Sequence, residues 1–124
     1  NRTRLLVILA HATHIFELHT MKMLHLLETA PNPLGLAALS LDGESSLCVV
    51  LPTATKPSPG RLVIFDATHG HPLSTVRAHE SEVAALAISP GGEMLATASL
   101  KGTVIRVFSM PYGELLHTLR RGTM

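Results

Sequence analysis

The chain has 124 residues, of which 46% are hydrophobic and only 15% are charged. This length and composition suit a domain with an apolar core and are too apolar for intrinsic disorder. The formal net charge of +1 argues against a general nucleic-acid binder, because non-specific affinity for nucleic acid requires many phosphate contacts. Any recognition of an anion must therefore come from a local cluster of residues.

The sequence contains one cysteine and no long apolar segment. Cys48 has no partner for an internal disulfide and lies among apolar residues, which predicts a buried, unreactive thiol and fits the cytoplasm. The longest apolar run, residues 5–10, is far too short to cross a bilayer, so we expect no transmembrane segment. The chain opens at Asn1 in the middle of a pattern, and we expect it to be a fragment.

Apolar and β-branched runs, separated by Gly, Pro, Asp and Ser, predict a chain of short strands. In chain order the predicted strands are residues 4–10, 13–18, 22–28, 36–41, 46–51, 61–66, 73–77, 83–89, 94–99, 103–109 and 114–120. Residues 52–60 hold three prolines and predict a long loop. A short helix over residues 34–41 is the competing interpretation, but Pro31, Pro33 and Gly35 interrupt its start.

The predicted strands repeat. Each copy carries a β-branched residue followed by Phe16, Phe65 or Phe108, at offsets of 49 and 43 residues. A period in the forties is the length of a four-stranded propeller blade. We therefore expect an all-β fragment of a β-propeller, about two and three-quarter blades long. Residues 1–29 would give three strands of one blade, residues 34–78 a second blade and residues 82–122 a third.

The last predicted blade offers a site for a phosphate group. An antiparallel meander brings His79, the turn between Ser99 and Thr103, and Arg120 to the same end of the blade. Imidazole, hydroxyl and guanidinium groups are hydrogen-bond donors suited to phosphate. Arg120 and Arg121 are neighbours on a strand, so their side chains point to opposite faces and can serve two pockets. The alternative is that these residues only favour a turn and a solvated strand end.

Most WD repeats end their third strand with Trp-Asp, and this chain departs from that pattern. The corresponding dipeptides are Phe16-Glu17, Phe65-Asp66 and Phe108-Ser109. With Leu119-Arg120-Arg121-Gly122, and with residues 96–109 and 33–36, the sequence resembles the PROPPIN (WIPI) family of WD-repeat propellers. The resemblance covers nearly the whole chain and is nearest to the WIPI-one and WIPI-two branch.

The resemblance implies a seven-bladed propeller that binds phosphatidylinositol 3-phosphate and phosphatidylinositol 3,5-bisphosphate in two rim pockets. Such a protein would act in autophagosome formation and in endosomal and vacuolar traffic. It would lie in the cytoplasm, peripherally on preautophagosomal, endosomal or vacuolar membranes. The first pocket would be made by His79, Ser99, Lys101, Thr103 and Arg120. Arg106 would support this pocket or pair with a carboxylate, and Arg121 would belong to the second pocket, whose remaining residues and membrane-inserting loop would follow Met124.

Other functions have less support in the sequence. Arg2 matches a basic contact that the WIPI branch makes with an autophagy conjugation scaffold, although His19 stands where those relatives carry arginine. The histidine pairs at residues 11 and 14 and at residues 69 and 71 face no third ligand, so we expect no metal site. No catalytic or cofactor motif is present, and we expect no enzyme. The alternative function is a propeller that binds only proteins.

Overall fold

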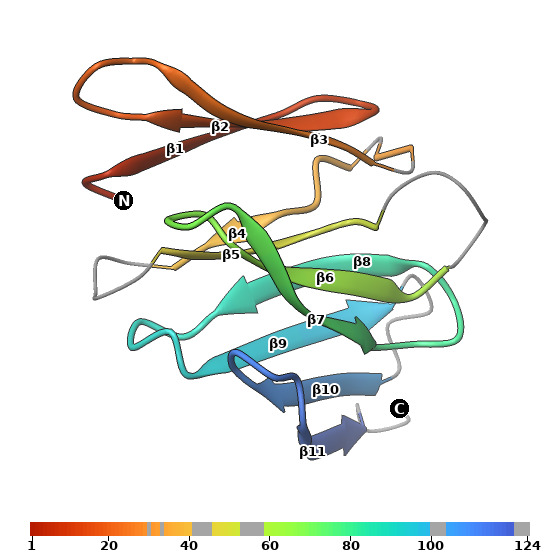
Figure 1. Ribbon diagram of the computed structural model, residues 1–124. Helices are drawn as coiled ribbons and strands as arrows, with labels where there is room; N and C mark the ends of the chain where they lie inside the picture. Colours follow the sequence, from red (N-terminus) through yellow and green to blue (C-terminus); the bar gives the residue numbers. More distant parts are fainter. Residues whose placement is uncertain (30, 33, 41–45, 53–58, 100–103, 121–124) are drawn as a thin grey trace.

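The computed structural model describes residues 1–29, 31–32, 34–40, 46–52, 59–99 and 104–120, and their strands form three antiparallel sheets (Figure 1). The first sheet contains β1 (Arg4–Ile8), β2 (Ala12–Glu17) and β3 (Met23–Glu28). The second contains β4 (Ala38–Leu39), β5 (Leu47–Val50), β6 (Arg61–Asp66) and β7 (His71–Arg77). The third contains β8 (Val83–Ile88), β9 (Met94–Ser99), β10 (Val104–Ser109) and β11 (Leu115–Arg120). Within each sheet, consecutive strands are neighbours, as the repeat predicts.

The prediction of an all-β chain is confirmed, and the described residues contain no helix, including over residues 34–40. The main difference is β4, which has two residues where the sequence predicts a strand over 36–41. Asn32 explains the late start of this strand. Its side-chain Oδ1 accepts the N–H of Leu36 at 2.8 Å, and its Nδ2 donates to the carbonyl of Leu36 at 3.0 Å. The backbone groups of Leu36 are therefore bonded outside the strand ladder.

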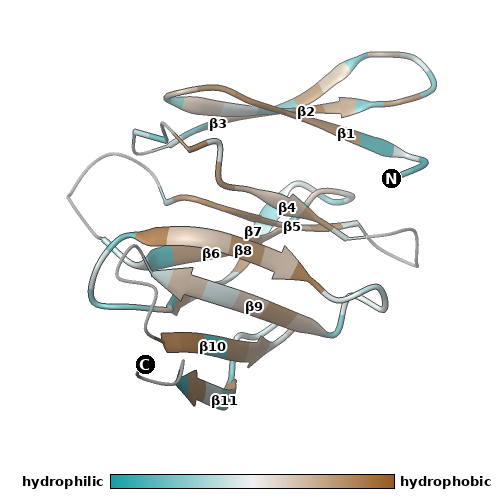
Figure 2. Cartoon of the chain, turned by 180° about the vertical axis from the view of Figure 1, so that it is seen from behind, coloured by the Kyte–Doolittle hydropathy of each residue, from teal (hydrophilic) through white to brown (hydrophobic). Residues whose placement is uncertain are grey.

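The three sheets are stacked, and two apolar clusters fill the spaces between them (Figure 1). One cluster joins the first and second sheets and includes Ile15, Cys48 and Phe65. The other joins the second and third sheets; its buried members are Val49, Leu62, Ile64, Val76, Ala78, Val83, Leu95 and Phe108. Because successive strand residues point to opposite faces, a sheet covered on both sides has strands that are apolar throughout. Figure 2 accordingly shows mainly hydrophobic strands and more hydrophilic turns.

The buried Cys48 thiol is confirmed. Its side chain has no solvent exposure, and burial, followed by the nearby charge of Asp66, raises the pKa of Cys48 to about 12. The thiolate is the reactive form of cysteine, so this thiol is unreactive near neutral pH. Across the described ranges, no helix has the length and apolar character needed to span a bilayer.

Candidate functional site

Two of the predicted site residues, Ser99 and Arg120, lie at the end of the third sheet where β9 and β11 finish and β8 and β10 begin. Ser99, the last residue of β9, is paired with Val83 on β8. Arg120, the last residue of β11, is paired with Val104 on β10. The meander therefore brings Ser99 and Arg120 to one end of one sheet. Lys101, Thr103 and Arg121 lie outside the described residues.

The same register places these side chains on one face of the sheet. Thr97 is directly opposite Arg106, and directly opposed residues share a face, as do residues two apart along a strand. Ser99 is therefore on the face of Thr97, and Arg120, opposite Val104, is on the face of Arg106. Leu95 and Phe108 occupy this face further along the strands and pack against the second sheet. The polar residues thus lie at one end of the boundary between two sheets.

His79 is buried at this boundary, with 4% of its surface exposed. Its Nε2 lies 2.9 Å from Oγ1 of Thr97, which in turn lies 3.4 Å from the carbonyl oxygen of Arg106. Burial, and then the positive charge of Arg106, lower the pKa of His79, while a hydrogen bond with Thr97 acts in the opposite direction. His79 is consequently a neutral hydrogen-bonding group at neutral pH, and the positive charge of the site comes from the arginines.

Arg106 joins the third sheet to the segment that precedes it. Its Nη1 donates to the carbonyl of Ala78 at 2.7 Å. The sequence left open whether Arg106 supports the pocket or pairs with a carboxylate, and the described contact is with this backbone carbonyl. Arg106 therefore fixes the residue directly before His79. Because guanidinium has five N–H donors in a rigid plane, Arg106 can still donate to a ligand.

Gly60 holds the other side of the same segment. Its carbonyl accepts the N–H of Ala78 at 2.7 Å and that of His79 at 3.3 Å. Gly60 has a φ of +79°, and a Cβ built on it would overlap the carbonyl oxygen of His79. Only glycine allows both this left-handed conformation and this close approach. Residues 78 and 79 are thus fixed between the start of β6 and the face of the third sheet.

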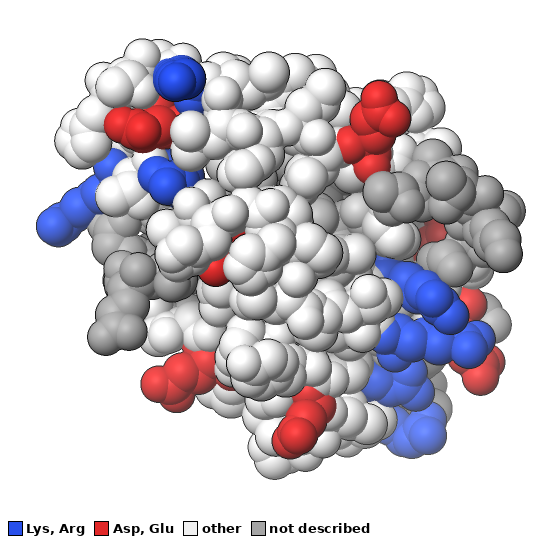
Figure 3. Space-filling model, in the orientation of Figure 1, with Lys and Arg blue, Asp and Glu red and all other residues white. Residues whose placement is uncertain are grey.

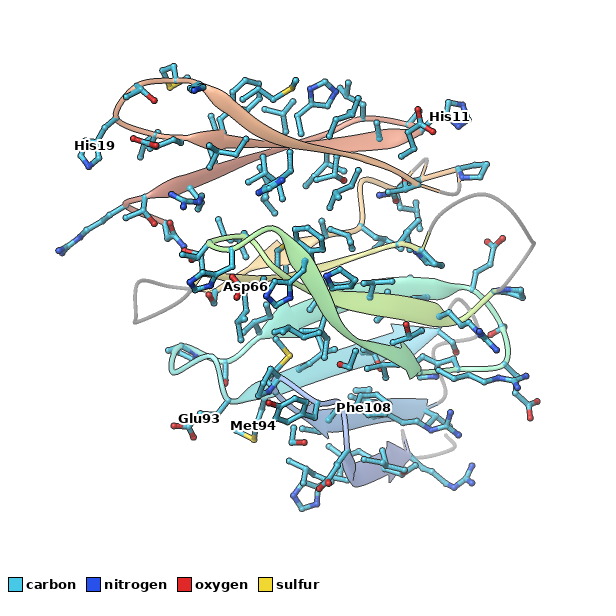
Figure 4. The ribbon with its side chains drawn as sticks, in the orientation of Figure 1. His11, His19, Asp66, Glu93, Met94 and Phe108 are labelled. Carbon is cyan, nitrogen blue, oxygen red and sulfur yellow. The ribbon has the colours of Figure 1, made fainter. Side chains whose placement is uncertain are left out.

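Arg120 and Ser99 differ in their access to solvent. Ser99 is 7% exposed, whereas Arg120 is in an exposed position on the outermost strand of the sheet. Within the described part of the chain, the guanidinium of Arg120 makes no hydrogen bond or ion pair. Lysine and arginine atoms gather along this edge of the molecule in Figure 3, on the lower right, where β7 and β11 end in Figure 1. Glu93 is labelled at the other end of the third sheet in Figure 4.

The sequence did not single out Thr97, which connects His79 to the third sheet. The available signal was a hydroxyl residue in an otherwise apolar strand, MLATAS, opposite an arginine in another apolar strand, VIRVFS. A polar side chain within an apolar strand usually requires a hydrogen-bond partner. Thr97 and Arg106 therefore each indicated a contact, which the structure shows to be with His79 and with Ala78. Their register could not be known before the strands were paired.

The remaining predicted residues lie elsewhere. Arg2 is exposed and precedes β1, near the N-terminal label in Figure 1, away from the end where β11 finishes. Nδ1 of His69 lies 2.8 Å from Oδ2 of Asp66, and the rings of His69 and His71 stack at 6.3 Å. Throughout the described residues, no three His, Cys, Asp or Glu side chains are placed to hold a metal ion.

The stacked meanders and the repeated register define part of a β-propeller, with a polar site at the boundary of two blades. The whole chain, residues 1–124, matches the model of the PROPPIN family. It is 45% identical over 123 residues to "WD repeat domain phosphoinositide-interacting protein 2" of Xenopus laevis, covering 98% of this chain and 28% of that protein. It is 39% identical over 140 residues to "Autophagy-related protein 18" of Mycosarcoma maydis, covering 99% of this chain and 31% of that protein. This chain belongs to the PROPPIN family.

Solved structures agree with this assignment. The complex of KlAtg21 with the coiled coil of AgAtg16 matches with a TM-score of 0.82 and 27% identity, over 100% of this chain and 41% of that chain. The crystal structure of Kluyvelomyces marxianus Hsv2 matches with a TM-score of 0.75 over 98% of this chain and 36% of that chain. Its identity of 21% shows a shared fold alone. The chain spans about a third of the length of the curated relatives that it matches.

Proposed function

We propose that this chain forms part of a non-enzymatic adaptor that binds phosphatidylinositol 3-phosphate and phosphatidylinositol 3,5-bisphosphate and acts in autophagosome formation and endosomal or vacuolar membrane traffic. The observation that carries the proposal is the exposed Arg120 on the same sheet face as the His79–Thr97 contact and Arg106. The relatives support the cellular role, because one bears the name of an autophagy protein and another that of a phosphoinositide-interacting protein.

The site would bind a phosphate through groups of different kinds. Arg120 would supply an exposed guanidinium, and charge-assisted hydrogen bonds each contribute about 1.5–3 kcal/mol before the cost of desolvation. Arg106 would contribute charge near the phosphate while it remains bonded to Ala78. His79, neutral and held by Thr97, would orient the pocket wall and offer its remaining ring nitrogen. Ser99 would add a hydroxyl, and Lys101 and Thr103 would complete the first pocket.

The adaptor would reach useful affinity by combining several weak contacts. Strand alternation predicts that the side chain of Arg121 points away from that of Arg120, so Arg121 would belong to a second pocket. Two pockets on one membrane would give avidity. A membrane-inserting loop would add apolar contact with the lipid. The protein would then be a cytoplasmic one that binds preautophagosomal, endosomal or vacuolar membranes peripherally.

A protein partner is also part of the proposal. The matching KlAtg21 structure is a complex with the coiled coil of AgAtg16, so a related autophagy scaffold is a candidate partner for this chain. Arg2 is exposed and would supply one basic contact. The sequence places His19, which is also exposed, where an arginine would strengthen that contact.

A second candidate function is a propeller that scaffolds proteins without binding lipid. It is favoured by the contacts that His79 and Arg106 already make with Thr97 and Ala78, because residues with structural roles need no ligand to explain them. Under this alternative, Arg120 would be a solvated surface charge of little consequence.

Liposome flotation of the full-length protein separates the two functions. Vesicles of phosphatidylcholine with phosphatidylinositol 3-phosphate should carry the protein, whereas vesicles with phosphatidylserine alone should leave it behind. The double variant Arg120→Ala/Arg121→Ala should stay behind in both cases while keeping its circular dichroism spectrum. Equal binding to both vesicles by the wild type, or normal binding by the double variant, would contradict the pocket and favour the scaffold.

A further inference from the structure

A second pair of arginines lies on the sheet next to the proposed pocket. Arg61 is the first residue of β6, Arg77 is the last residue of β7, and the two are directly opposite each other. In the third sheet, Val104 and Arg120 occupy the same places, at the start of β10 and the end of β11. Arg77 is thus the repeat equivalent of Arg120, and its cross-strand partner carries a second positive charge where the third sheet has valine.

The two side chains share a face, and no carboxylate of the described residues forms an ion pair with them. Leu62 follows Arg61, Val76 precedes Arg77, and both apolar residues pack toward the third sheet. Strand alternation therefore directs the two arginines to the opposite face of the second sheet. Both are exposed, and like charges in direct opposition destabilise a strand pair. In the part of the chain that the structure describes, neither guanidinium makes a hydrogen bond or an ion pair.

The arginine pair is continuous with the proposed pocket. Arg77 precedes Ala78, whose carbonyl accepts the hydrogen bond of Arg106, and Arg61 follows Gly60, whose carbonyl accepts the N–H of Ala78. Ala78 is therefore bonded on one side to Arg106, a residue of the proposed pocket, and on the other side to Gly60, which precedes Arg61. Figure 3 shows Lys and Arg atoms gathered along this edge, with acidic atoms beside them. Glu80 and Glu82 are exposed nearby but form no ion pair with an arginine among the described residues.

We propose that Arg61 and Arg77 form a contact surface for anionic lipid headgroups, next to the phosphoinositide pocket and facing the same membrane. The inference rests on the proposed function for its orientation, because a membrane that reaches Arg120 from this edge also reaches the equivalent position one blade earlier. Two exposed guanidiniums that make no ion pair or hydrogen bond with the described residues suit several weakly held phosphate or carboxylate groups. The two arginines would be attracted to any anionic membrane surface, while the pocket would bind the phosphoinositide headgroup specifically.

The test compares the full-length wild type with Arg61→Gln/Arg77→Gln on phosphatidylcholine vesicles, with and without phosphatidylinositol 3-phosphate and phosphatidylserine. We expect phosphatidylserine to strengthen binding of the wild type to phosphoinositide vesicles, by up to about fivefold for each arginine near the surface. The double variant should lose most of this gain, yet bind phosphoinositide vesicles without phosphatidylserine as the wild type does. Lys22→Glu is the matched control, because it removes the same two units of charge from the exposed β2–β3 turn of the first sheet and should keep the gain.

Two results would overturn the contact surface. Equal loss in the double variant with and without phosphatidylserine would place Arg61 and Arg77 in the pocket itself. Equal loss of the gain in Lys22→Glu would show an effect of total charge. The proposed function fails separately, if the wild type binds vesicles with and without phosphatidylinositol 3-phosphate equally. A gain from phosphatidylserine that disappears only in the double variant would still support the contact surface in that case.

Discussion

The second and third sheets share one register but differ at one pair of directly opposed residues. In the second sheet Val50 on β5 is opposite Val63 on β6, and in the third sheet Thr97 on β9 is opposite Arg106 on β10. The apolar pair needs only neighbours to pack against. The polar pair requires His79 for Thr97 and the carbonyl of Ala78 for Arg106. A blade of this fold can therefore form with two valines at these positions.

The polar pair is compatible with folding only because its groups are satisfied. Burying a hydroxyl or an amide-like group without a hydrogen bond costs about 1–3 kcal/mol in proteins. Among the described residues, no buried side-chain nitrogen or oxygen lacks a partner. We therefore expect the third sheet to be more sensitive to single changes at this end than the second sheet is. The predictions below follow that difference from its largest expected effect to its smallest.

Gly60→Ala should have the largest effect on stability. The substitution forces a left-handed φ on alanine, which costs about 1–2 kcal/mol, and brings its Cβ into the backbone of His79. The segment of residues 78 and 79 must move, so its contacts with Arg106 and Thr97 should weaken. We expect the free energy of unfolding of the full-length protein to fall by more than about 3 kcal/mol, measured by chemical denaturation.

Gly35→Ala is the control for Gly60→Ala. Gly35 has a φ of +65°, but a Cβ built on it meets no atom within 4 Å. Gly35→Ala should therefore lower the free energy of unfolding only by the cost of a left-handed φ on alanine, about 1–2 kcal/mol. Equal losses for the two variants would show that the close approach of Gly60 to His79 does not hold the site together.

Thr97→Val places in the third sheet the residue type that the second sheet has at the equivalent position, Val50. It should have the next largest effect on stability. It removes the hydroxyl that His79 contacts and leaves a buried imidazole nitrogen without a partner, which costs about 1–3 kcal/mol. His79→Leu in the same background should recover part of this loss, because replacing both partners by apolar groups is nearly neutral. The measurement is a double-mutant cycle in urea, and additive effects would mean that the two side chains are not coupled.

The two sheets should also respond to acid in different pH ranges. Burial and Arg106 lower the pKa of His79 below its ordinary value of 6.5, so the unfolded chain takes up the proton first. The stability due to neutral His79 is present above 6.5 and is lost as pH falls from there through the folded pKa. His79→Gln should abolish this part of the pH profile of the unfolding midpoint, whereas a profile identical to the wild type would exclude His79 as its source.

In the second sheet, the pH range in which stability is lost is lower, because the titrating group is the Asp66 carboxylate. Burial raises its pKa, but hydrogen bonds from the backbone and ring of His69 and from the backbone of Thr68 outweigh burial and lower it below 3.8. The carboxylate contributes stability above 3.8, and this is lost as pH falls through the lowered pKa. Asp66→Asn should remove the low-pH part of the profile and leave the part due to His79 unchanged.

The sequence predicted the strands well because each carries a local signal. The repeated phenylalanines and the glycine and proline turns located β6, β9 and β10 closely, and the period indicated a propeller. The sequence did not predict the short β4, which depends on the bonds of the Asn32 side chain to Leu36, or the contact of Thr97 with His79. Both depend on three-dimensional neighbours, and the pairing of Arg61 with Arg77 likewise emerged only with the register.

Arg120→Ala and Arg77→Ala should have the smallest effects on stability and the clearest difference in binding. Both residues are exposed at the end of a fourth strand, and neither makes an ion pair within the described ranges, so each variant should unfold within about 0.5 kcal/mol of the wild type. Arg120 shares its face with Thr97 and Arg106, whereas the equivalent face of the second sheet presents Val50 and Val63. Arg120→Ala should therefore weaken binding of the full-length protein to phosphatidylinositol 3-phosphate in phosphatidylcholine vesicles by about tenfold or more, the loss of one charge-assisted hydrogen bond. Arg77→Ala should bind those vesicles as the wild type does. If both variants lose binding equally, the polar pair of Thr97 and Arg106 does not distinguish the two blade ends, and the pocket is not confined to the third sheet.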